Sequence, residues 1–148
     1  MSYNITELKE EHWDRLLQFF KEFKEEKHPF FKIQEVVGLD KDVIFDGKKQ
    51  RFIVLDGDDV IGYCFYYQYK MAEVTCSIGY GILERYKGRG ISDLIIGKLH
   101  SHAILNGYRQ FVACVASNNW RNVIVLYKHG YRVTDEDTGI LYFCKRPA

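Results

Sequence analysis

The chain has 148 residues, with 21 Lys and Arg against 20 Asp and Glu, and a net charge of +1. This balance lacks the overall basicity of a dedicated nucleic-acid or anionic-membrane binder, so we expect neither as a partner. A chain of this length can bury a sizeable core, and we expect a single domain over residues 1–148.

The sequence also indicates where the protein works. Its first residues, MSYNITELKEEHWDR, contain no apolar signal core, and no apolar run of about 18 residues occurs, so we expect a cytoplasmic protein. We expect a monomer or a homodimer. No C-x-x-C pair or Cys/His cluster at metal-ligand spacing is present, so we expect no metal. Reduced core cysteines are predicted at Cys64, Cys76, Cys114 and Cys144.

Hydrophobic periodicity and turn residues predict the elements of the first half. In chain order they are a short strand (residues 2–8), an amphipathic helix (10–27), a short helix around 33–38 before a loop through Asp46 and Gly47, two strands joined by a tight turn (51–56 and 60–69), and a third strand (73–82).

The second half alternates helices and strands. The predicted elements are a helix (residues 91–105), a strand buried on both faces (111–115), a second helix (119–129) and two closing strands (131–133 and 139–144). On the first of these helices the packed face is expected to hold Ile91, Leu94, Ile95, Leu99 and Ala103. The order predicts an α/β fold of mixed type, with a central mixed sheet of six to seven strands, antiparallel in its first half, flanked by about four helices.

The most informative stretch is ILERYKGRGISDLII, residues 82–96, in which a strand runs through a Gly-x-Gly turn into a helix. The first amides of a helix have no partner within it, and the helix dipole adds positive charge at the same end. Gly88 and Gly90 let the backbone approach an anion, while Lys87 and Arg89 add charge for phosphate oxygens. The bland alternative is a tight strand-to-helix connection with two exposed cations.

Spacing separates the phosphate-binding motifs that such a turn could represent. A Walker loop, G-x-x-x-x-G-K-[ST], is absent, and a dinucleotide fingerprint requires a small residue where this chain has Asp93. The turn fits [QRK]-G-x-G-[ILV]-[GAS] after a strand. Read this way, residues 82–92 resemble the V-x-P-x-Y-R-G-x-G-I-G pattern of the GNAT acyltransferases. Lys87, Ser92 and Glu84 depart mildly from it, and an overlapping R-x-x-G-x-G register begins at Arg85.

A second match to the same family lies downstream. GNAT chains carry N-x-x-[AS]-x-x-[LV]-Y-x-K-x-G-F, and here residues 119–131 read NWRNVIVLYKHGY. The resemblance implies that Asn119 fixes the strand-helix junction and contacts coenzyme A. A plain helix N-cap is the alternative for this residue, and the two roles are compatible.

The resemblance implies a GNAT-like fold and an N-acetyltransferase that uses acetyl-CoA as cosubstrate, with direct transfer to a primary amine of a small molecule or peptide. The pyrophosphate is then expected on the backbone of Lys87, Gly88, Arg89, Gly90, Ile91, Ser92 and Asp93. Gly79 and Gly81 predict that the strand over residues 73–82 opens from that over residues 111–115. The pantetheine arm and the thioester carbonyl are expected to use the exposed backbone of Tyr80, Gly81 and Ile82.

The catalytic residues are less well defined by the sequence. In relatives a Tyr on the helix after the Asn protonates the leaving thiolate, but the gap-free alignment puts Leu126 there and Tyr127 one residue late. One residue is about 100° of helix rotation. Tyr127 is therefore either the general acid or a structural aromatic residue. Glu73 is the candidate base, although a solvated edge carboxylate or a water relay to a distant base fits equally.

Two other functions remain open at this point. A GNAT-like domain that binds acyl-CoA as a regulatory or docking signal, without transfer, is favoured by Leu126 at the acid position. An RNA-binding module using Lys87, Arg89 and tyrosines is weaker, because the charge is balanced. The resemblance places the acceptor wall at residues 28–49 and 131–139. Four aromatic residues either form a partly aromatic pocket there or belong to the core: Phe30, Phe31, Phe45 and Tyr69.

Overall fold

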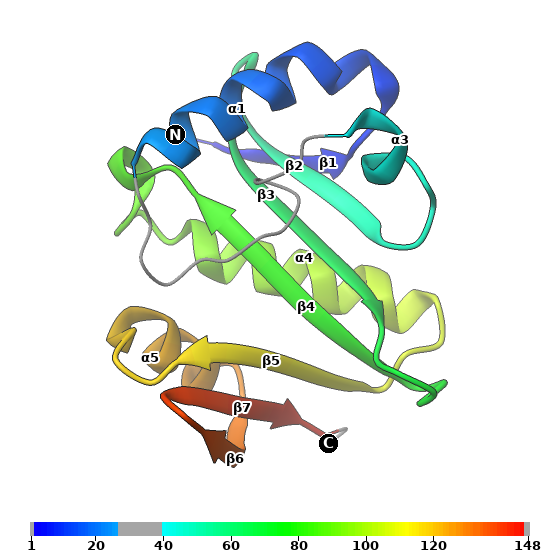
Figure 1. The fold of residues 1–148 in the computed structure, drawn as a ribbon, viewed down its shortest axis with the longest axis vertical. Helices are drawn as coiled ribbons and strands as arrows, with labels where there is room; N and C mark the ends of the chain where they lie inside the picture. Colours follow the sequence, from blue (N-terminus) through cyan, green and yellow to red (C-terminus); the bar gives the residue numbers. More distant parts are fainter. Residues whose placement is uncertain (1, 27–39, 147–148) are drawn as a thin grey trace. The chain divides into compact units, whose positions relative to one another are not determined.

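The computed structural model describes residues 2–26 and 40–146. Within them, seven strands form one mixed sheet in the order β1-β2-β3-β4-β5-β7-β6, accompanied by four α-helices (Figure 1). The predicted fold class is confirmed. The elements are β1 (Asn4–Glu7), η1 (Glu10–His12), α1 (Trp13–Glu25), α3 (Lys41–Ile44), β2 (Gln50–Asp56), β3 (Asp59–Gln68), β4 (Thr75–Ile82), η2 (Glu84–Tyr86), α4 (Ile91–Leu105), β5 (Gln110–Ala116), α5 (Trp120–Lys128), β6 (Arg132–Asp137) and β7 (Ile140–Lys145).

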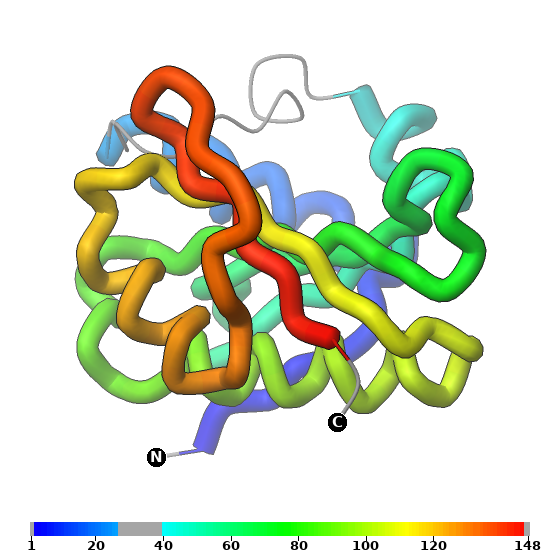
Figure 2. Tube along the Cα trace, turned by 90° about the horizontal axis from the view of Figure 1, so that it is seen from below, coloured from blue at the N-terminus to red at the C-terminus, as the bar shows by residue number. Residues whose placement is uncertain are grey.

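Strand direction follows from the connections. β1 and β2 are antiparallel, as are β5 with β7 and β6 with β7. β4 and β5 are parallel, and α4 makes the crossover that a parallel pair requires. Figure 2 shows the β6–β7 hairpin, orange to red, beside the yellow β5. A register shift at residues 133–135 marks a bulge in β6.

Contacts divide the chain into two interleaved units, residues 1–65 with 80–91 and residues 66–79 with 92–148. The prediction of a single domain therefore stays a prediction. The short helix expected around residues 33–38 lies outside the described residues.

The core of the first unit is aromatic. α1 contributes four buried side chains, and the ring of Phe20 meets that of Tyr63 edge-on, with centroids 5.2 Å apart. The buried residues of α1 are Leu16, Phe19, Phe20 and Phe23.

A buried arginine joins β2 to the short helix α3. Arg51 donates from Nε to the Tyr63 hydroxyl at 2.9 Å and from Nη1 to the Ile44 carbonyl at 2.6 Å, with Asp46 at 3.6 Å. These partners satisfy a charge that would be costly to bury alone. The sequence predicted a loop here, because four helical residues are too few to show a period.

The second unit packs one face of α4. Ile95, Ile96, Leu99 and Ala103 are buried, but Leu94 is 50% exposed, so its predicted place on the packed face is wrong. Residues 94 and 99 are five positions apart, which places them about 140° apart around a helix. The predicted bounds of this helix, residues 91–105, are confirmed.

β5 is buried on alternate residues instead of on both faces. Phe111, Ala113 and Val115 are buried, whereas Cys114 is exposed, which corrects both the predicted burial of the strand and the predicted core position of this cysteine. An uninterrupted apolar run has no period, so the sequence could not show which face is covered. All four cysteines are free, and the other three are buried.

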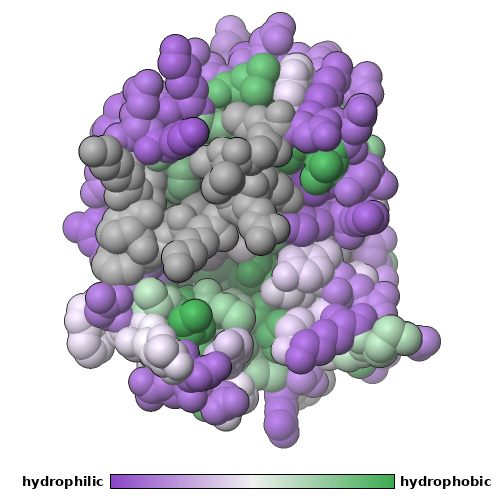
Figure 3. All heavy atoms as spheres, in the orientation of Figure 1, coloured by the Kyte–Doolittle hydropathy of each residue, from purple (hydrophilic) through white to green (hydrophobic). Residues whose placement is uncertain are grey.

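The surface shows the usual separation of side-chain types. In Figure 3 most of the coloured surface is hydrophilic, with apolar residues in smaller groups between the hydrophilic ones. On α5, Trp120, Ile124 and Tyr127 are exposed at helical spacing, while Val123 and Leu126 are buried. α5 therefore carries apolar side chains on two faces.

A buried histidine ties α4 to the segment after α5. The His100 Nε2 lies 2.6 Å from the Tyr131 hydroxyl, and its ring packs on Phe111 with centroids 4.2 Å apart. Burial, with smaller contributions from Lys145 and His129, lowers the pKa of His100 from 6.5 to about 4. The imidazole is therefore neutral at pH 7 in the folded protein.

This histidine makes stability depend on pH. Because the unfolded chain takes up this proton at a higher pH than the folded chain, the free energy of unfolding falls as pH decreases from 6.5 toward 4, by at most about 3 kcal/mol. Urea unfolding at pH 7, 5.5 and 4.5 measures the fall. His100→Gln keeps a partner for Tyr131 without titrating, so this variant should show a shallower slope over the same range. An unchanged slope in His100→Gln contradicts the assignment.

Candidate functional site

The glycine turn connects η2 to α4 through residues 87–90. Gly88 and Gly90 both have φ of +79°, a left-handed conformation that other residues adopt only with strain. All four residues are exposed, and a Cβ placed on either glycine would have no atom within 4 Å. The turn therefore leaves open space next to its backbone, as the approach of an anion requires.

Tyr86 anchors the turn within the first unit. Its buried ring packs edge-on to Tyr3, with centroids 6.1 Å apart, and its hydroxyl donates to the Asp56 carboxylate at 2.7 Å. This hydrogen bond raises the pKa of Tyr86. The Glu84 amide donates to the Glu26 carboxylate at 3.0 Å. These contacts fix the backbone immediately before the glycines.

Lys87 and Arg89, the two cations predicted to screen phosphate charge, each contact a neighbouring side chain of the first unit. Lys87 Nζ is 2.8 Å from the Glu84 carboxylate. The Arg89 guanidinium carbon lies 5.0 Å from the centre of the Tyr86 ring, and its Nη1 donates to the Tyr3 hydroxyl at 3.4 Å. Such exposed pairs are weak, so either cation can exchange its partner for a phosphate oxygen.

The first turn of α4 presents the amides of Ile91, Ser92 and Asp93 at the positive end of a 15-residue helix. The Asp93 side chain does not extend freely from it. One carboxylate oxygen lies 2.8 Å from His129 Nε2 and the other 3.3 Å from Lys128 Nζ, at the end of α5. No sequence signal indicated this contact, because the partners are about 35 residues apart without a shared period.

Asn119 stands at the N-cap position of α5, but its side chain makes no capping hydrogen bond. Its backbone is fixed, since its amide donates to the Ala116 carbonyl at 2.9 Å and its carbonyl accepts from Val123 at 3.1 Å. The interpretation of Asn119 as a cap alone is therefore not supported.

Leu126 and Tyr127 lie on different faces of α5. Leu126 is 1% exposed and belongs to the core, whereas Tyr127 is 44% exposed. The Tyr127 ring packs edge-on to Phe143, with centroids 5.7 Å apart, and the Arg132 guanidinium lies 5.6 Å from its centre. Of these two residues, only Tyr127 has a hydroxyl that can donate a proton.

Glu73 was expected at the start of a strand, but it lies in an exposed turn, and β4 begins at Thr75. Strand β4 separates this turn from Tyr80, and at about 3.3 Å per residue its five steps from Thr75 to Tyr80 span about 17 Å. A proton-transfer partner must come within hydrogen-bond reach, so this placement does not favour Glu73 as the base. Its role stays a prediction.

The pairing of β4 with β5 is short. It runs from Thr75 and Gln110 to Ser77 and Val112, while β4 continues to Ile82 and β5 to Ala116. The two strands are therefore not paired along their whole shared length, which confirms the predicted opening between them. Binding of a ligand by the backbone of Tyr80, Gly81 and Ile82 stays a prediction.

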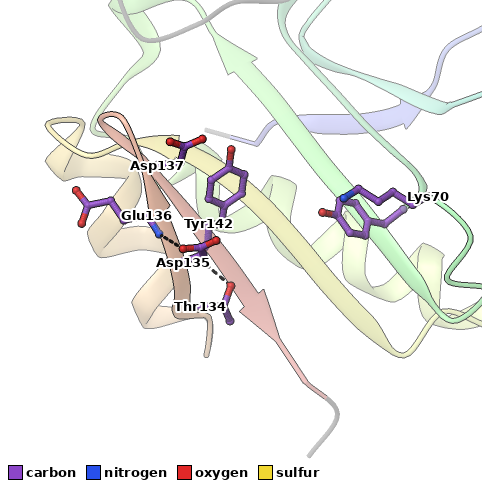
Figure 4. Close-up of a pocket in the computed structure, with 7 residues that line it drawn as sticks. Lys70, Thr134, Asp135, Glu136, Asp137 and Tyr142 are labelled. Carbon is purple, nitrogen blue, oxygen red and sulfur yellow. Dashed lines mark hydrogen bonds between the residues drawn. The ribbon is translucent and has the colours of Figure 1, made fainter.

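A pocket of about 510 Å³ lies within the second unit. Figure 4 shows Tyr142 and Asp137 on the β6–β7 hairpin, Lys70 across the pocket from them, and Glu136 extending the other way. Asp135 and Asp137 against one lysine make this pocket favourable for a cation. Its lining residues are Tyr69, Lys70, Thr134, Asp135, Glu136, Asp137 and Tyr142.

The described part of the chain holds neither a metal site nor a membrane-spanning helix. Residues 2–26 and 40–146 contain no group of three His, Cys, Asp or Glu side chains that could hold a metal ion. No helix among them is long and apolar enough to cross a membrane.

Residues 7–131 match the model of the acetyltransferase (GNAT) family. The chain belongs to the GNAT acetyltransferase family. Members of this family use acetyl-CoA.

Solved GNAT structures share the fold. An acetyltransferase of the GNAT family from Streptococcus pneumoniae is 16% identical, with a TM-score of 0.77 over 98% of this chain and 99% of that one. An N-acetyltransferase from Staphylococcus aureus Mu50 is 15% identical, with a TM-score of 0.79 over 99% of each chain. The PaiA N-acetyltransferase from Thermoplasma acidophilum, in complex with coenzyme A, is 14% identical, with a TM-score of 0.76 over 99% of each chain.

Two glycines of the GNAT chain allow a matched test of the turn. Gly90→Ala places an L-residue at φ +79° and should lower the free energy of unfolding by about 1–2 kcal/mol. Gly97→Ala, on exposed α4 and with equally open space, should raise it by up to about 1 kcal/mol. Urea unfolding measures both. Equal effects would show that φ at Gly90 does not constrain this turn.

Proposed function

We propose that this protein is an acetyl-CoA-dependent N-acetyltransferase that transfers the acetyl group directly to a primary amine in a ternary complex. The observation that carries the proposal is the exposed turn with two left-handed glycines that opens α4, in a chain of the GNAT family. This backbone fits the pyrophosphate of coenzyme A, because it combines open space with helix-start amides.

The proposed cofactor site follows the chain from β4 to α4. The amides of residues 87–93 receive the pyrophosphate, with Lys87 and Arg89 beside them. The backbone of Tyr80, Gly81 and Ile82 receives the pantetheine arm and provides an amide for the thioester oxygen, a contact of about 3–4 kcal/mol in the transition state. The end of β4–β5 pairing at Ser77 supports this part of the proposal. Asn119, whose side chain does not cap α5, is proposed to contact coenzyme A as well.

Transfer needs an amine that has lost its proton. The amine nitrogen attacks the thioester carbonyl, the C–N bond forms, the C–S bond breaks, and the thiolate takes up a proton. We propose Tyr127 as the donor of that proton, because it exposes a hydroxyl while Leu126 is buried. For the base, water-mediated transfer is favoured over Glu73, which lies in the β3–β4 turn.

The alternative is a GNAT-like domain that binds acyl-CoA as a regulatory or docking signal without transfer. Leu126 at the usual acid position, with its side chain in the core, is the observation that favours it. Turnover with any acceptor excludes it.

Calorimetric titration with coenzyme A and release of thiol from acetyl-CoA over an amine panel test the two functions together. We expect binding, turnover with at least one amine, and loss of the coenzyme A-induced melting shift in Gly90→Arg. Tyr127→Phe should lower kcat by about a hundredfold with unchanged coenzyme A binding. Absence of binding contradicts both functions, and binding without any turnover supports the signalling domain.

We further propose that the acceptor approaches through the pocket of the second unit. Tyr69 and residues 134–137 line it. The resemblance to GNAT chains implies an acceptor wall at residues 131–139, and Tyr69 was expected in its aromatic lining. Its carboxylates favour an amine that carries an additional positive charge, and its tyrosine rings can pack on the alkyl chain of such a molecule.

Removing two carboxylates of the pocket tests the acceptor site. Asp135→Asn with Asp137→Asn should raise KM for a diamine by about three- to tenfold, since exposed ion pairs contribute up to about 1 kcal/mol each. KM for acetyl-CoA should not change. Glu136→Gln, which alters the side chain that extends the other way, is the matched control. An equal rise in all these variants would indicate general electrostatics instead of a site.

A further inference from the structure

Asp93 is the third residue of α4, a position from which a carboxylate can reach back to the amides at the start of its own helix. The helix dipole favours a negative charge there. These are the amides to which the proposed function assigns the pyrophosphate. Asp93 is therefore a potential internal competitor for the cofactor site.

The structure holds this carboxylate on α5. Both oxygens are engaged, one by His129 Nε2 at 2.8 Å and the other by Lys128 Nζ at 3.3 Å. The hydrogen bond from His129, followed by that from Lys128, lowers the pKa of Asp93, so the carboxylate is ionised. Among the described residues, its hydrogen bonds all run to α5.

Lys128 and His129 belong to a well-anchored segment. The amides of His129, Gly130 and Tyr131 bond back to carbonyls of the last turn of α5, and Gly130 has φ of +90°. Tyr131 is in turn fixed by His100, seven residues after Asp93 on α4. Seven residues are about two helical turns, so both contacts lie on one face of α4.

We propose that Lys128 and His129 act as positioning residues that hold the Asp93 carboxylate away from the first amides of α4 and so keep them available for the pyrophosphate. This inference rests on the proposed cofactor site. It assigns to the Lys-His pair at the end of α5 an electrostatic role toward a carboxylate, and no direct contact with the cofactor.

A double-mutant cycle tests the proposal. Lys128→Met with His129→Phe removes both donors and keeps side-chain bulk; it should weaken coenzyme A binding about three- to tenfold, the effect of one charge at a helix start. In the Asp93→Asn background the same two changes should alter the Kd by less than about twofold, because no carboxylate remains to be released. Lys98→Met, an exposed lysine of α4, is the control for loss of charge.

Every other result overturns the proposal. Equal weakening with and without Asp93 would mean that Lys128 and His129 act directly on the phosphates. Weakening by Asp93→Asn alone would mean that the bridge only joins the helices. If Lys128→Met with His129→Phe had no effect on binding, these two residues would not be needed to hold Asp93 away from the amides. Circular dichroism and melting confirm that each variant is folded.

A second measurement does not depend on the cofactor. In the protein without ligand, Lys128→Met with His129→Phe should shift the amide protons of Ile91, Ser92 and Asp93 downfield, as the carboxylate turns to them, and the shift should vanish in the Asp93→Asn background. Unchanged amide shifts contradict the proposal. Failure of the wild-type protein to bind coenzyme A contradicts the proposed function alone, and the two results are distinguishable.

Discussion

The first amides of α4 have no hydrogen-bond acceptor within the helix, and the rest of the structure depends on keeping them accessible. Two glycines at φ +79° deliver the chain into the helix without a side chain over these amides. An exposed, positively polarised backbone of this kind is poorly stabilised by itself. It is useful only if the chain on either side of it is held firmly.

Anchoring is provided separately before and after the turn. Before it, Tyr86 is fixed by its hydroxyl on Asp56 and by its packing on Tyr3. After it, Asp93 is bound to the end of α5, and His100 is hydrogen-bonded to Tyr131 in a buried environment. Each of these contacts pairs a polar group that would otherwise be costly to bury or would be attracted to the helix start. The exposed cations of the turn, in contrast, have only weak partners and can rearrange around an anion.

The sequence predicted the parts of the protein that depend on local pattern. The bounds of α4 follow from the spacing of its apolar residues and from the glycines before it. The turn follows from Gly88 and Gly90, because glycine favours the left-handed conformation that both residues adopt. Burial was harder to predict. Leu94 and Cys114 were assigned to the core because apolar character does not indicate which face is covered. Glu73 was assigned to a strand because the turn before β4 contains no glycine or proline, only Lys70 at φ +51°.

Contacts between distant side chains could not be predicted at all. The bond between Asp93 and His129 joins segments whose separation has no period in the sequence. For the acidic pocket of Tyr69 and residues 134–137, the resemblance to GNAT chains indicated the segments but not the side chains that meet. For the β4–β5 pair, Gly79 and Gly81 predicted an interruption of the pairing but not its register.

A crystal structure of the protein with coenzyme A bound tests the central claim most directly. The account predicts diphosphate oxygens within about 2.7–3.2 Å of backbone amides between Gly88 and Asp93, with the Asp93 carboxylate still on His129. A diphosphate bound elsewhere on the protein, with these amides in contact only with water, would contradict it.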